Sequence, residues 1–168
     1  MKQPHVGFGP KNFDLAIYIA NRPPIDHYPQ LDQLQVLAPG EVAAITARTS
    51  NHWRKAFNVC AKFIVELRGE QYSQPSWQAF RDRQLFQADC REALLFSPPN
   101  LQSPGIHIIA GKTYASDLSL DVPLTWLDNY FAVNRQFRLV VSPYLDYRQL
   151  SNARIIQLVT LVKSLAKT

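Results

Sequence analysis

Short apolar runs, each ended by a turn signal, recur along this chain and constrain its fold more than any other feature. Residues 13–20 (FDLAIYIA), 106–109 (IHII) and 138–141 (RLVV) are apolar and rich in β-branched side chains, which is typical of buried strands. Proline or glycine follows each run, and these residues end regular structure. The turn signals are Asn21-Arg22-Pro23-Pro24, Gly111-Lys112 and Ser142-Pro143. We therefore predict three buried strands at these positions.

Helical patterns occupy much of the chain between these runs. The clearest helix is predicted over residues 51–68, where apolar side chains recur at spacings of 3 and 4 and Gly69 ends the helix. Another is predicted over residues 152–166, capped by Ser151. The apolar stripe of the first helix consists of Trp53, Phe57, Cys60, Ile64 and Leu67. The other predicted helical segments are residues 77–94, a leucine face within residues 25–47 (Leu31, Leu34 and Leu37), a turn begun by Pro39-Gly40-Glu41, and the segment after Gly111-Lys112.

Strands that alternate with helices at this spacing indicate an α/β fold. We predict a three-layer α/β/α domain with a short, mostly parallel sheet that helices cover on both faces. A chain of 168 residues has the length of one domain, so residues 1–168 are predicted to form a single domain. Ligands bind at the carboxyl ends of strands in such folds. Residues 21–24, 111–113 and 142–152 are therefore the candidate binding segments.

Composition and the motifs that the sequence lacks exclude several classes of protein. The chain is 46% hydrophobic and 18% charged, which excludes a disordered tail, a collagen-like repeat and a coiled coil. Its longest apolar run is residues 15–20, so we expect no membrane span, and we expect no secretory signal. No metal-binding, phosphate-cradling or nucleophile-elbow motif is present, so we expect no metal and no cofactor. Cys60 and Cys90 belong to no C-x-x-C motif. We therefore expect two buried thiols in a reducing cytoplasm.

The positive charge of the chain is concentrated in its last 40 residues. Residues 1–128 carry 12 basic and 12 acidic side chains, whereas residues 129–168 carry six basic side chains and one acidic one, Asp146, and supply the whole net charge of +5. A localised basic surface favours an anionic partner such as DNA or a nucleotide. A solvated charged face is the alternative. The six basic residues are Arg135, Arg138, Arg148, Arg154, Lys163 and Lys167.

Three segments, in order along the chain, resemble motifs of one enzyme superfamily. Residues 50–55 (SNHWRK) resemble its S-N-R-F-W-K motif at the start of the first large helix. Residues 108–114 (IIAGKTY) are similar to its strand-turn-helix motif I-L-G-K-x-A-Y, and residues 139–148 (LVVSPYLDYR) to its last strand and H/N-P-S-x-x-S-R loop. The chain thus resembles the uracil-DNA glycosylase superfamily, most closely its mismatch-specific uracil/thymine type. The resemblance implies a uracil-DNA glycosylase-like fold and a DNA partner.

The same resemblance implies the position of a catalytic residue. In that superfamily a polar residue at the end of the first strand positions the attacking water. Two segments compete for this place: LAPG carries Ala38 where the superfamily has asparagine, whereas IANRP supplies Asn21 at the end of a better strand. We favour Asn21 as the candidate catalytic residue. Because Ser142 and Tyr144 replace the polar and small residues of the last loop, the resemblance implies that glycosylase chemistry has decayed or changed.

Candidate binding residues lie mainly in the last loop and in the helix that follows it. The resemblance implies that Arg148 contacts or intercalates DNA, and Tyr144, Tyr147 and Arg154 add the aromatic and cationic groups that a nucleic-acid surface uses. Alternatively, the tyrosines pack on the sheet, the arginines are solvated, and Asp146 pairs with Arg148 instead of serving as a base. The other candidates are Asn51, alternatively a helix cap, Lys112, alternatively a solvated lysine, and Ser142.

The sequence leaves several functions open. The leading hypothesis is a uracil-DNA glycosylase-like domain that binds nucleic acid or nucleotide with degenerate catalytic motifs. The alternatives are an active base-excision glycosylase and a non-enzymatic assembly module. Converging Arg148, Arg154 and Lys112 would favour nucleic acid, whereas an exposed apolar patch would favour assembly.

A remote alternative is a flavin- or dinucleotide-binding fragment. Residues 7–16 (GFGPKNFDLA) resemble the G-x-G-P-x-N-L-x-L-A start of flavin-dependent amine N-hydroxylases. There the glycines let the backbone approach a pyrophosphate at a helix N-terminus. That hypothesis requires a helix over residues 13–20, where the sequence predicts a strand.

Overall fold

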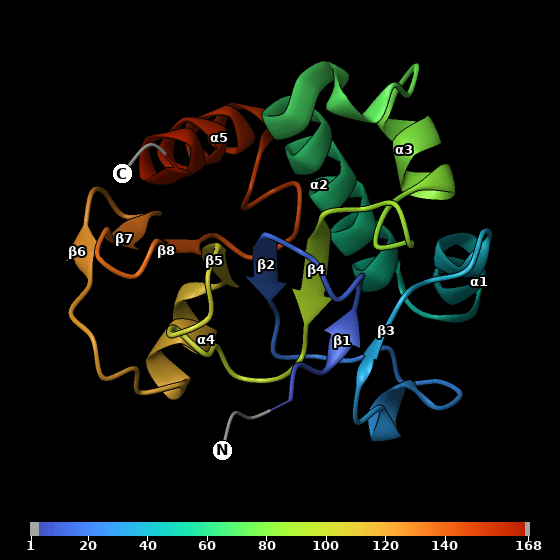
Figure 1. Cartoon of the computed structure of the whole chain (residues 1–168), viewed down its shortest axis with the longest axis horizontal. Helices are drawn as coiled ribbons and strands as arrows, with labels where there is room; N and C mark the ends of the chain where they lie inside the picture. The colour runs from blue at the N-terminus through green and yellow to red at the C-terminus, as the bar shows by residue number, and fades with distance from the viewer. Residues whose placement is uncertain (1–3, 167–168) are drawn as a thin grey trace.

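The computed structural model describes residues 4–166, which form one eight-stranded sheet with helices packed on it (Figure 1). The order of strands across the sheet is β3-β1-β4-β2-β5-β8-β7-β6. The strands are β1 (Gly7–Phe8), β2 (Leu15–Tyr18), β3 (Leu34–Gln35), β4 (Glu92–Leu95), β5 (Ile106–Ala110), β6 (Thr125–Trp126), β7 (Ala132–Asn134) and β8 (Leu139–Ser142). The helices are α1 (Glu41–Arg48), α2 (Asn51–Arg68), α3 (Trp77–Arg83), α4 (Lys112–Asp117) and α5 (Asn152–Ala166), with two 3-10 turns, η1 (Tyr28–Gln30) and η2 (Gly69–Tyr72).

Four parallel strands form the centre of the sheet. β2 pairs in parallel with both β4 and β5, and β5 pairs in parallel with β8. Every residue of these four strands is buried, as expected for strands covered on both faces. The α/β class and the three predicted strands, now β2, β5 and β8, are therefore confirmed. The pairing aligns the carboxyl ends of the strands: Tyr18 lies opposite Leu95 and Ile109, and Ala110 lies opposite Ser142.

The sheet is wider than the short sheet that we predicted, and that part of the prediction is wrong. β1 pairs antiparallel with β4, β7 with β8, and β6 with β7. Short strands therefore extend the parallel centre on both sides. β1, β3, β6 and β7 are only two or three residues long, so they contain no alternation of polar and apolar residues that would reveal them in the sequence.

A central strand occupies the place where we predicted the end of a helix. The helix predicted over residues 77–94 ends at Arg83, and Glu92–Leu95 form β4 between β1 and β2. Ser76 caps α3, since its Oγ accepts a hydrogen bond from the backbone N–H of Ala79 at 3.1 Å. The sequence Glu-Ala-Leu-Leu favours a helix intrinsically. Burial between two strands overrides this preference.

The leucine face predicted within residues 25–47 is also wrong. Leu31 directly follows η1, Leu34 lies in β3, and Leu37 packs in the core. Prolines break this segment because they lack the backbone N–H that a longer helix needs. The helix predicted to begin at Pro39-Gly40-Glu41 is confirmed as α1.

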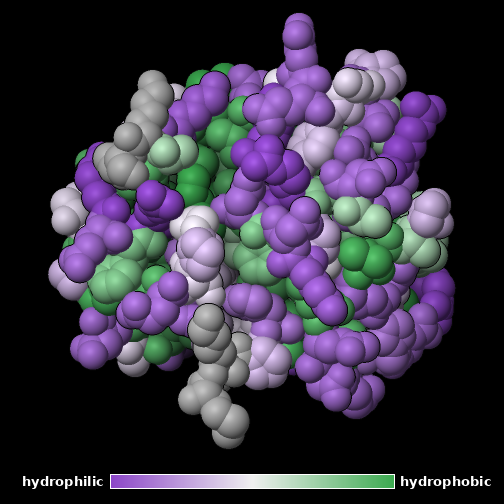
Figure 2. Space-filling model, viewed as in Figure 1, coloured by the Kyte–Doolittle hydropathy of each residue, from purple (hydrophilic) through white to green (hydrophobic). Residues whose placement is uncertain are grey.

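Helices cover the two faces of the sheet unequally (Figure 1). α1, α2, α3 and α5 contribute to the larger core on one face, together with Leu15 and Ile17 of β2. α4 and the loops near it contribute to a smaller core on the other face, together with Ala16 and Tyr18. Alternate residues of β2 thus enter opposite cores, as strand geometry requires. On the side of the molecule drawn in Figure 2, the surface is mostly hydrophilic and the hydrophobic side chains form small separate patches.

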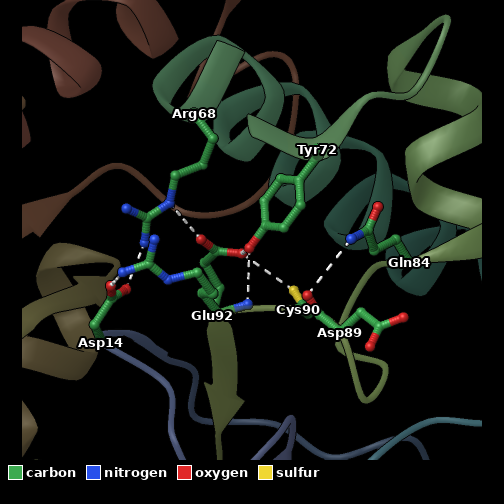
Figure 3. A network of polar contacts seen from close by, with 8 residues as sticks. Asp14, Arg68, Tyr72, Gln84, Asp89, Cys90 and Glu92 are labelled. Atoms are coloured by element: carbon green, nitrogen blue, oxygen red, sulfur yellow. Dashed lines mark hydrogen bonds and ion pairs between the residues drawn. The ribbon is translucent and has the colours of Figure 1, made fainter. Parts of the chain in front are cut away.

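A fully buried carboxylate joins β4 to α2 near the amino ends of the central strands (Figure 3). Glu92 Oε2 accepts a hydrogen bond from Arg68 Nε at 2.6 Å, and Glu92 Oε1 accepts one from Tyr72 Oη at 2.7 Å. Arg68 Nη2 also donates to Asp14 Oδ1 at 2.5 Å. Burial raises the pKa of the Cys90 thiol to about 12, so its proton remains available to Glu92 Oε1 at 3.1 Å. These contacts link the amino ends of β2 and β4 to the end of α2.

A buried histidine makes the stability of the fold depend on pH. His107 Nε2 faces the carbonyl oxygen of Ser103 at 3.1 Å and therefore carries the proton, so Nδ1 accepts from Tyr18 Oη at 2.7 Å. Burial lowers the pKa of His107 from its ordinary value of 6.5, and the unfolded chain then binds a proton that the folded chain excludes. We expect the free energy of unfolding to fall as the pH drops below about 6.5, by at most about 1.4 kcal/mol per pH unit for this proton.

Urea unfolding of the wild type and of His107→Gln between neutral and mildly acidic pH measures this effect. The glutamine cannot take up the proton, so the variant is expected to lose less of its stability on acidification. Burial also lowers the pKa of His5 and of His52, so part of the pH dependence will persist. An identical pH dependence in the two proteins would contradict the assignment to His107.

Candidate functional site

The carboxyl ends of the central strands bring together segments that are far apart in the sequence. Asn21 follows β2, Lys112 begins α4 directly after β5, and Tyr144 follows β8. Two pockets of about 380 Å³ and about 250 Å³ lie here and share Lys112, Tyr144 and Gln149. We call these two pockets, with the side chains that contact their walls, the edge site.

Tyr144 is the centre of the polar contacts at the edge site. Asn21 Nδ2 donates a hydrogen bond to Tyr144 Oη at 3.3 Å, and His52 Nε2 contacts the same hydroxyl. The His52 and Tyr144 rings also stack, with their centroids 5.4 Å apart. Burial raises the pKa of Tyr144 and lowers the pKa of His52. The tyrosine therefore keeps its proton and donates a hydrogen bond to a neutral His52.

The backbone next to Tyr144 requires a glycine. Gly111 has a φ of 105°, which other residues rarely adopt. A Cβ at this position would lie 3.5 Å from Tyr144 Cδ1, an ordinary contact. The left-handed conformation, and not a lack of space, is therefore what requires glycine between β5 and α4.

The two candidates for the water-positioning residue lie in different parts of the fold. Asn21 is at the carboxyl edge, beside Tyr144. Ala38 follows β3, which runs parallel to β1 and therefore antiparallel to β4. The backbone N–H of Ala38 donates to Glu41 Oε1 at 2.8 Å, at the start of α1. Of the two, Asn21 is the one that contacts the edge site, through its amide nitrogen.

Asp146 is paired with cations in the loop after β8. Its Oδ1 accepts a hydrogen bond from the backbone N–H of Arg148 at 2.9 Å and lies 3.5 Å from Arg148 Nε, and its Oδ2 lies 3.9 Å from Lys55 Nζ. The backbone N–H of Arg148 lowers the pKa of Asp146, so this carboxylate is a poor base. The two tyrosines of the loop differ, because Tyr144 packs against the core whereas Tyr147 is 55% exposed.

Three basic side chains from separate segments converge on the smaller pocket. Lys112 comes from α4, Arg148 from the loop after β8, and Arg154 from α5. Arg154 Nη1 donates to the carbonyl oxygen of Gln149 at 2.8 Å. Ser142 also lines this pocket, but it is buried and its Oγ donates to the carbonyl oxygen of Pro143 at 2.9 Å. The smaller pocket of the edge site is therefore basic, and the hydrogen-bonded Tyr144 is part of its wall.

Each of these three cations lies against an exposed aromatic ring. The distances to the ring centroids are 4.9 Å from Lys112 Nζ to Trp126, 3.6 Å from Arg154 Cζ to Tyr130, and 5.8 Å from Arg148 Cζ to Tyr147. Lys55 Nζ also lies 5.4 Å from the centroid of Tyr147. Contacts of this length are typical of cation–π pairs.

Trp126, Tyr130 and His52 are functional-site residues that the sequence did not predict. The two rings lie at the β6–β7 hairpin, whose sequence signal is Asp128-Asn129 between apolar residues. Asp128 Oδ1 accepts hydrogen bonds from the backbone N–H groups of Tyr130 at 2.7 Å and Phe131 at 2.8 Å, which shapes the turn. His52 lies within the SNHWRK segment, in which Asn51 is the predicted binding residue.

Asn51 is not among the residues that line the two pockets. It is the exposed first residue of α2, and Ser50 takes the N-cap position. The alternative prediction that Asn51 caps this helix is therefore wrong. His52, one residue further along the first turn, is the side chain that reaches Tyr144.

The glycine-rich segment near the start of the chain pairs in the sheet and does not begin a helix. Gly7 lies in β1, and the chain continues into the strand β2. A Cβ on Gly7 would lie 2.1 Å from the Leu94 carbonyl oxygen of β4. Glycine is needed here for the close approach of two strands, so the helix that the flavin hypothesis requires is absent from residues 13–20.

Comparison with known proteins assigns a family. The model of DUF6942, a family of unknown function, matches residues 6–163. The chain belongs to the DUF6942 family. The match includes every part of the edge site from Asn21 to Arg154. No curated protein and no solved structure matches this DUF6942 chain. Within residues 4–166 no helix has the length and apolar character needed to cross a membrane, and no three His, Cys, Asp or Glu side chains are grouped to hold a metal ion.

Proposed function

We propose that this DUF6942 protein binds nucleic acid at the edge site. The observation that carries the proposal is the convergence of Lys112, Arg148 and Arg154 on one pocket of about 250 Å³. Nucleic acids present a row of phosphates, and basic side chains that neutralise them supply most of the sequence-independent affinity. Three cations from three segments can contact several phosphates of such a row, whereas a ligand with one charged atom would contact fewer of the cations.

The surroundings of the pocket leave a positive balance. Three carboxylates lie nearby: Asp117 lines the larger pocket, Asp146 pairs with Arg148 and Lys55, and Asp128 accepts hydrogen bonds within its hairpin. The four cations Lys55, Lys112, Arg148 and Arg154 outnumber them. Of the basic residues after residue 128, Arg148 and Arg154 are at the edge site, whereas Arg138 and Lys163 line a different pocket of about 380 Å³ near the amino ends of the strands. Part of the charge excess therefore serves the proposed surface.

The resemblance to the uracil-DNA glycosylase superfamily adds support at the level of the fold. The segments 50–55, 108–114 and 139–148 all contribute to the edge site, through His52, Lys112 and Tyr144 respectively. A uracil-DNA glycosylase-like fold would have its DNA at this edge. We propose that the chain keeps this binding role with degenerate catalytic motifs. The buried free thiols Cys60 and Cys90 suit a reducing compartment, and we propose the cytoplasm.

Fluorescence anisotropy with labelled DNA and RNA oligonucleotides tests this function. Binding is expected near 50 mM salt and is expected to weaken about 40-fold near 200 mM, since three phosphate contacts to a duplex give a logarithmic salt slope near −2.7. Absence of binding to every oligonucleotide at the lower salt concentration would overturn the proposal. Affinity that does not change with salt would also contradict a phosphate-binding site.

The same preparation tests base excision, the alternative function. Uracil-containing and mismatched duplexes are incubated with the protein and then treated with alkali, which cleaves abasic sites. We expect no cleavage, because Ser142 and Tyr144 replace the polar and small residues that the glycosylase superfamily has in its last loop. Cleavage that disappears in Asn21→Ala would establish an active glycosylase in place of a binding protein.

A further inference from the structure

Exposed aromatic side chains are concentrated at the edge site. Among the described residues the large hydrophobic side chains that are most exposed include three aromatic ones: Trp126 at 40%, Tyr130 at 43% and Tyr147 at 55%. Each is the ring that contacts one of the three cations of the smaller pocket. A single exposed ring is ordinary, but three rings that contact the cations of one pocket are typical of a binding surface.

We propose that the nucleic acid at this site is single-stranded and that its bases stack on Trp126, Tyr130 and Tyr147. This inference rests on the proposed nucleic-acid function and names its substrate class. Every base has a flat face that stacks on an aromatic ring, and proteins that bind single strands combine such rings with a basic groove. In a duplex these faces are hidden between neighbouring bases, so a surface of stacking rings gains little from it.

Hydrogen bonds order the turns that carry two of the rings, Tyr130 and Tyr147. Asp128 fixes the turn that carries Tyr130 by accepting its backbone N–H, and Gln157 Nε2 of α5 donates to Asp128 Oδ2 at 2.8 Å. Asp146 orders the loop that carries Tyr147 by accepting the backbone N–H of Arg148. A ring that an ordered turn carries brings less loss of conformational freedom when a base stacks on it.

The pairing of each ring with a cation distinguishes this surface from an apolar docking patch. In each pair the cation lies over one face of the ring. It can contact a phosphate while the attached base stacks on the opposite face, so one pair serves one nucleotide. An acidic protein segment would use the cations but would gain nothing comparable from three rings. The pairs therefore favour single-stranded nucleic acid over an acidic protein chain, and the experiment below distinguishes the two.

The test compares an oligothymidylate, an oligouridylate and a duplex of matched length with the wild-type protein. We expect the single strands to bind at least about tenfold more tightly than the duplex. Trp126→Leu, Tyr130→Leu and Tyr147→Leu keep an apolar side chain and remove the ring, and each is expected to weaken single-strand binding by roughly 5- to 100-fold. Trp77→Leu is the control for loss of a tryptophan. Trp77 also contacts two cations, Lys62 and Arg81, but it lies away from the edge site and packs partly against the core.

The tryptophan emission at a saturating oligonucleotide concentration supplies a readout that is separate from the affinity. Stacking on Trp126 is expected to quench the emission, and the quenching should persist in Trp77→Leu and vanish in Trp126→Leu. If a duplex binds as tightly as a single strand and the ring variants bind normally, the single-strand inference is wrong while the nucleic-acid function stands. If nothing binds, the proposed function itself fails. If polyglutamate competes as well as the oligonucleotide, the occupant is an acidic chain and the inference is overturned.

Discussion

Replacing Lys112, Arg148 and Arg154 together with glutamine is expected to weaken nucleic-acid binding about 100-fold near 0.1 M salt. Each of these side chains lines the smaller pocket of the edge site, and each phosphate contact contributes about 0.7 to the salt slope for a single strand. Losing three contacts therefore removes about two powers of ten in affinity at this salt concentration. Anisotropy titrations at several salt concentrations measure both the affinity and the slope.

The matched control is Lys11, Arg83 and Arg135 replaced with glutamine. This variant loses the same net charge, and its three exposed side chains do not line the edge site. We expect it to retain most of the affinity and nearly all of the slope. Equal losses in the two variants would mean that overall charge, and not the edge site, holds the nucleic acid. Circular dichroism of both variants checks that the fold is retained.

Replacing Arg68 with methionine is expected to lower the free energy of unfolding by about 3–5 kcal/mol. The substitution keeps an apolar side chain of similar length but leaves Glu92, whose side chain is 0% exposed, without its cation. Asp14 loses a partner as well, at 2.5 Å from Arg68 Nη2. A buried charge that has lost its partner costs far more than the pair contributed. Urea unfolding at neutral pH measures the difference.

Two further variants identify the cause of that loss. Arg48 forms an ion pair with Asp26 in which both side chains are largely exposed, so Arg48→Met should lower the stability much less. The double variant Arg68→Met/Glu92→Leu removes both charges, and it should recover part of the stability that Arg68→Met loses. If Arg68→Met is no less stable than Arg48→Met, the buried pair does not stabilise the fold in the way that its geometry indicates.

The sequence predicted those helices and strands that carry a periodic pattern of apolar residues within one segment. β2, β5, β8, α2 and α5 each contain enough apolar residues at one period to identify them. β4 could not be predicted in this way, because Glu92–Leu95 is helix-forming by composition and becomes a strand through its neighbours β1 and β2. The two-residue strands have no period at all, so only their pairing partners define them.

The residues of the candidate site also fall into those that the sequence predicts and those that only the fold reveals. Lys112, Arg148 and Arg154 were predicted because basic residues near strand ends are visible in the sequence. Trp126 and Tyr130 were missed, since a ring becomes informative only when the fold leaves it exposed beside a cation that is distant along the chain. The contact between His52 and Tyr144, separated by 92 positions, required the sheet and α2 to be assembled first.

The buried Glu92 network and the edge site lie at opposite ends of the same four parallel strands. An engineer could therefore randomise the ligand-facing positions 126, 130, 147 and 148 in a library without touching the contacts of Arg68 and Tyr72 with Glu92. Most members of such a library should remain folded. Selection among them would then report on ligand preference alone, which makes the DUF6942 chain a practical scaffold for altering what it binds.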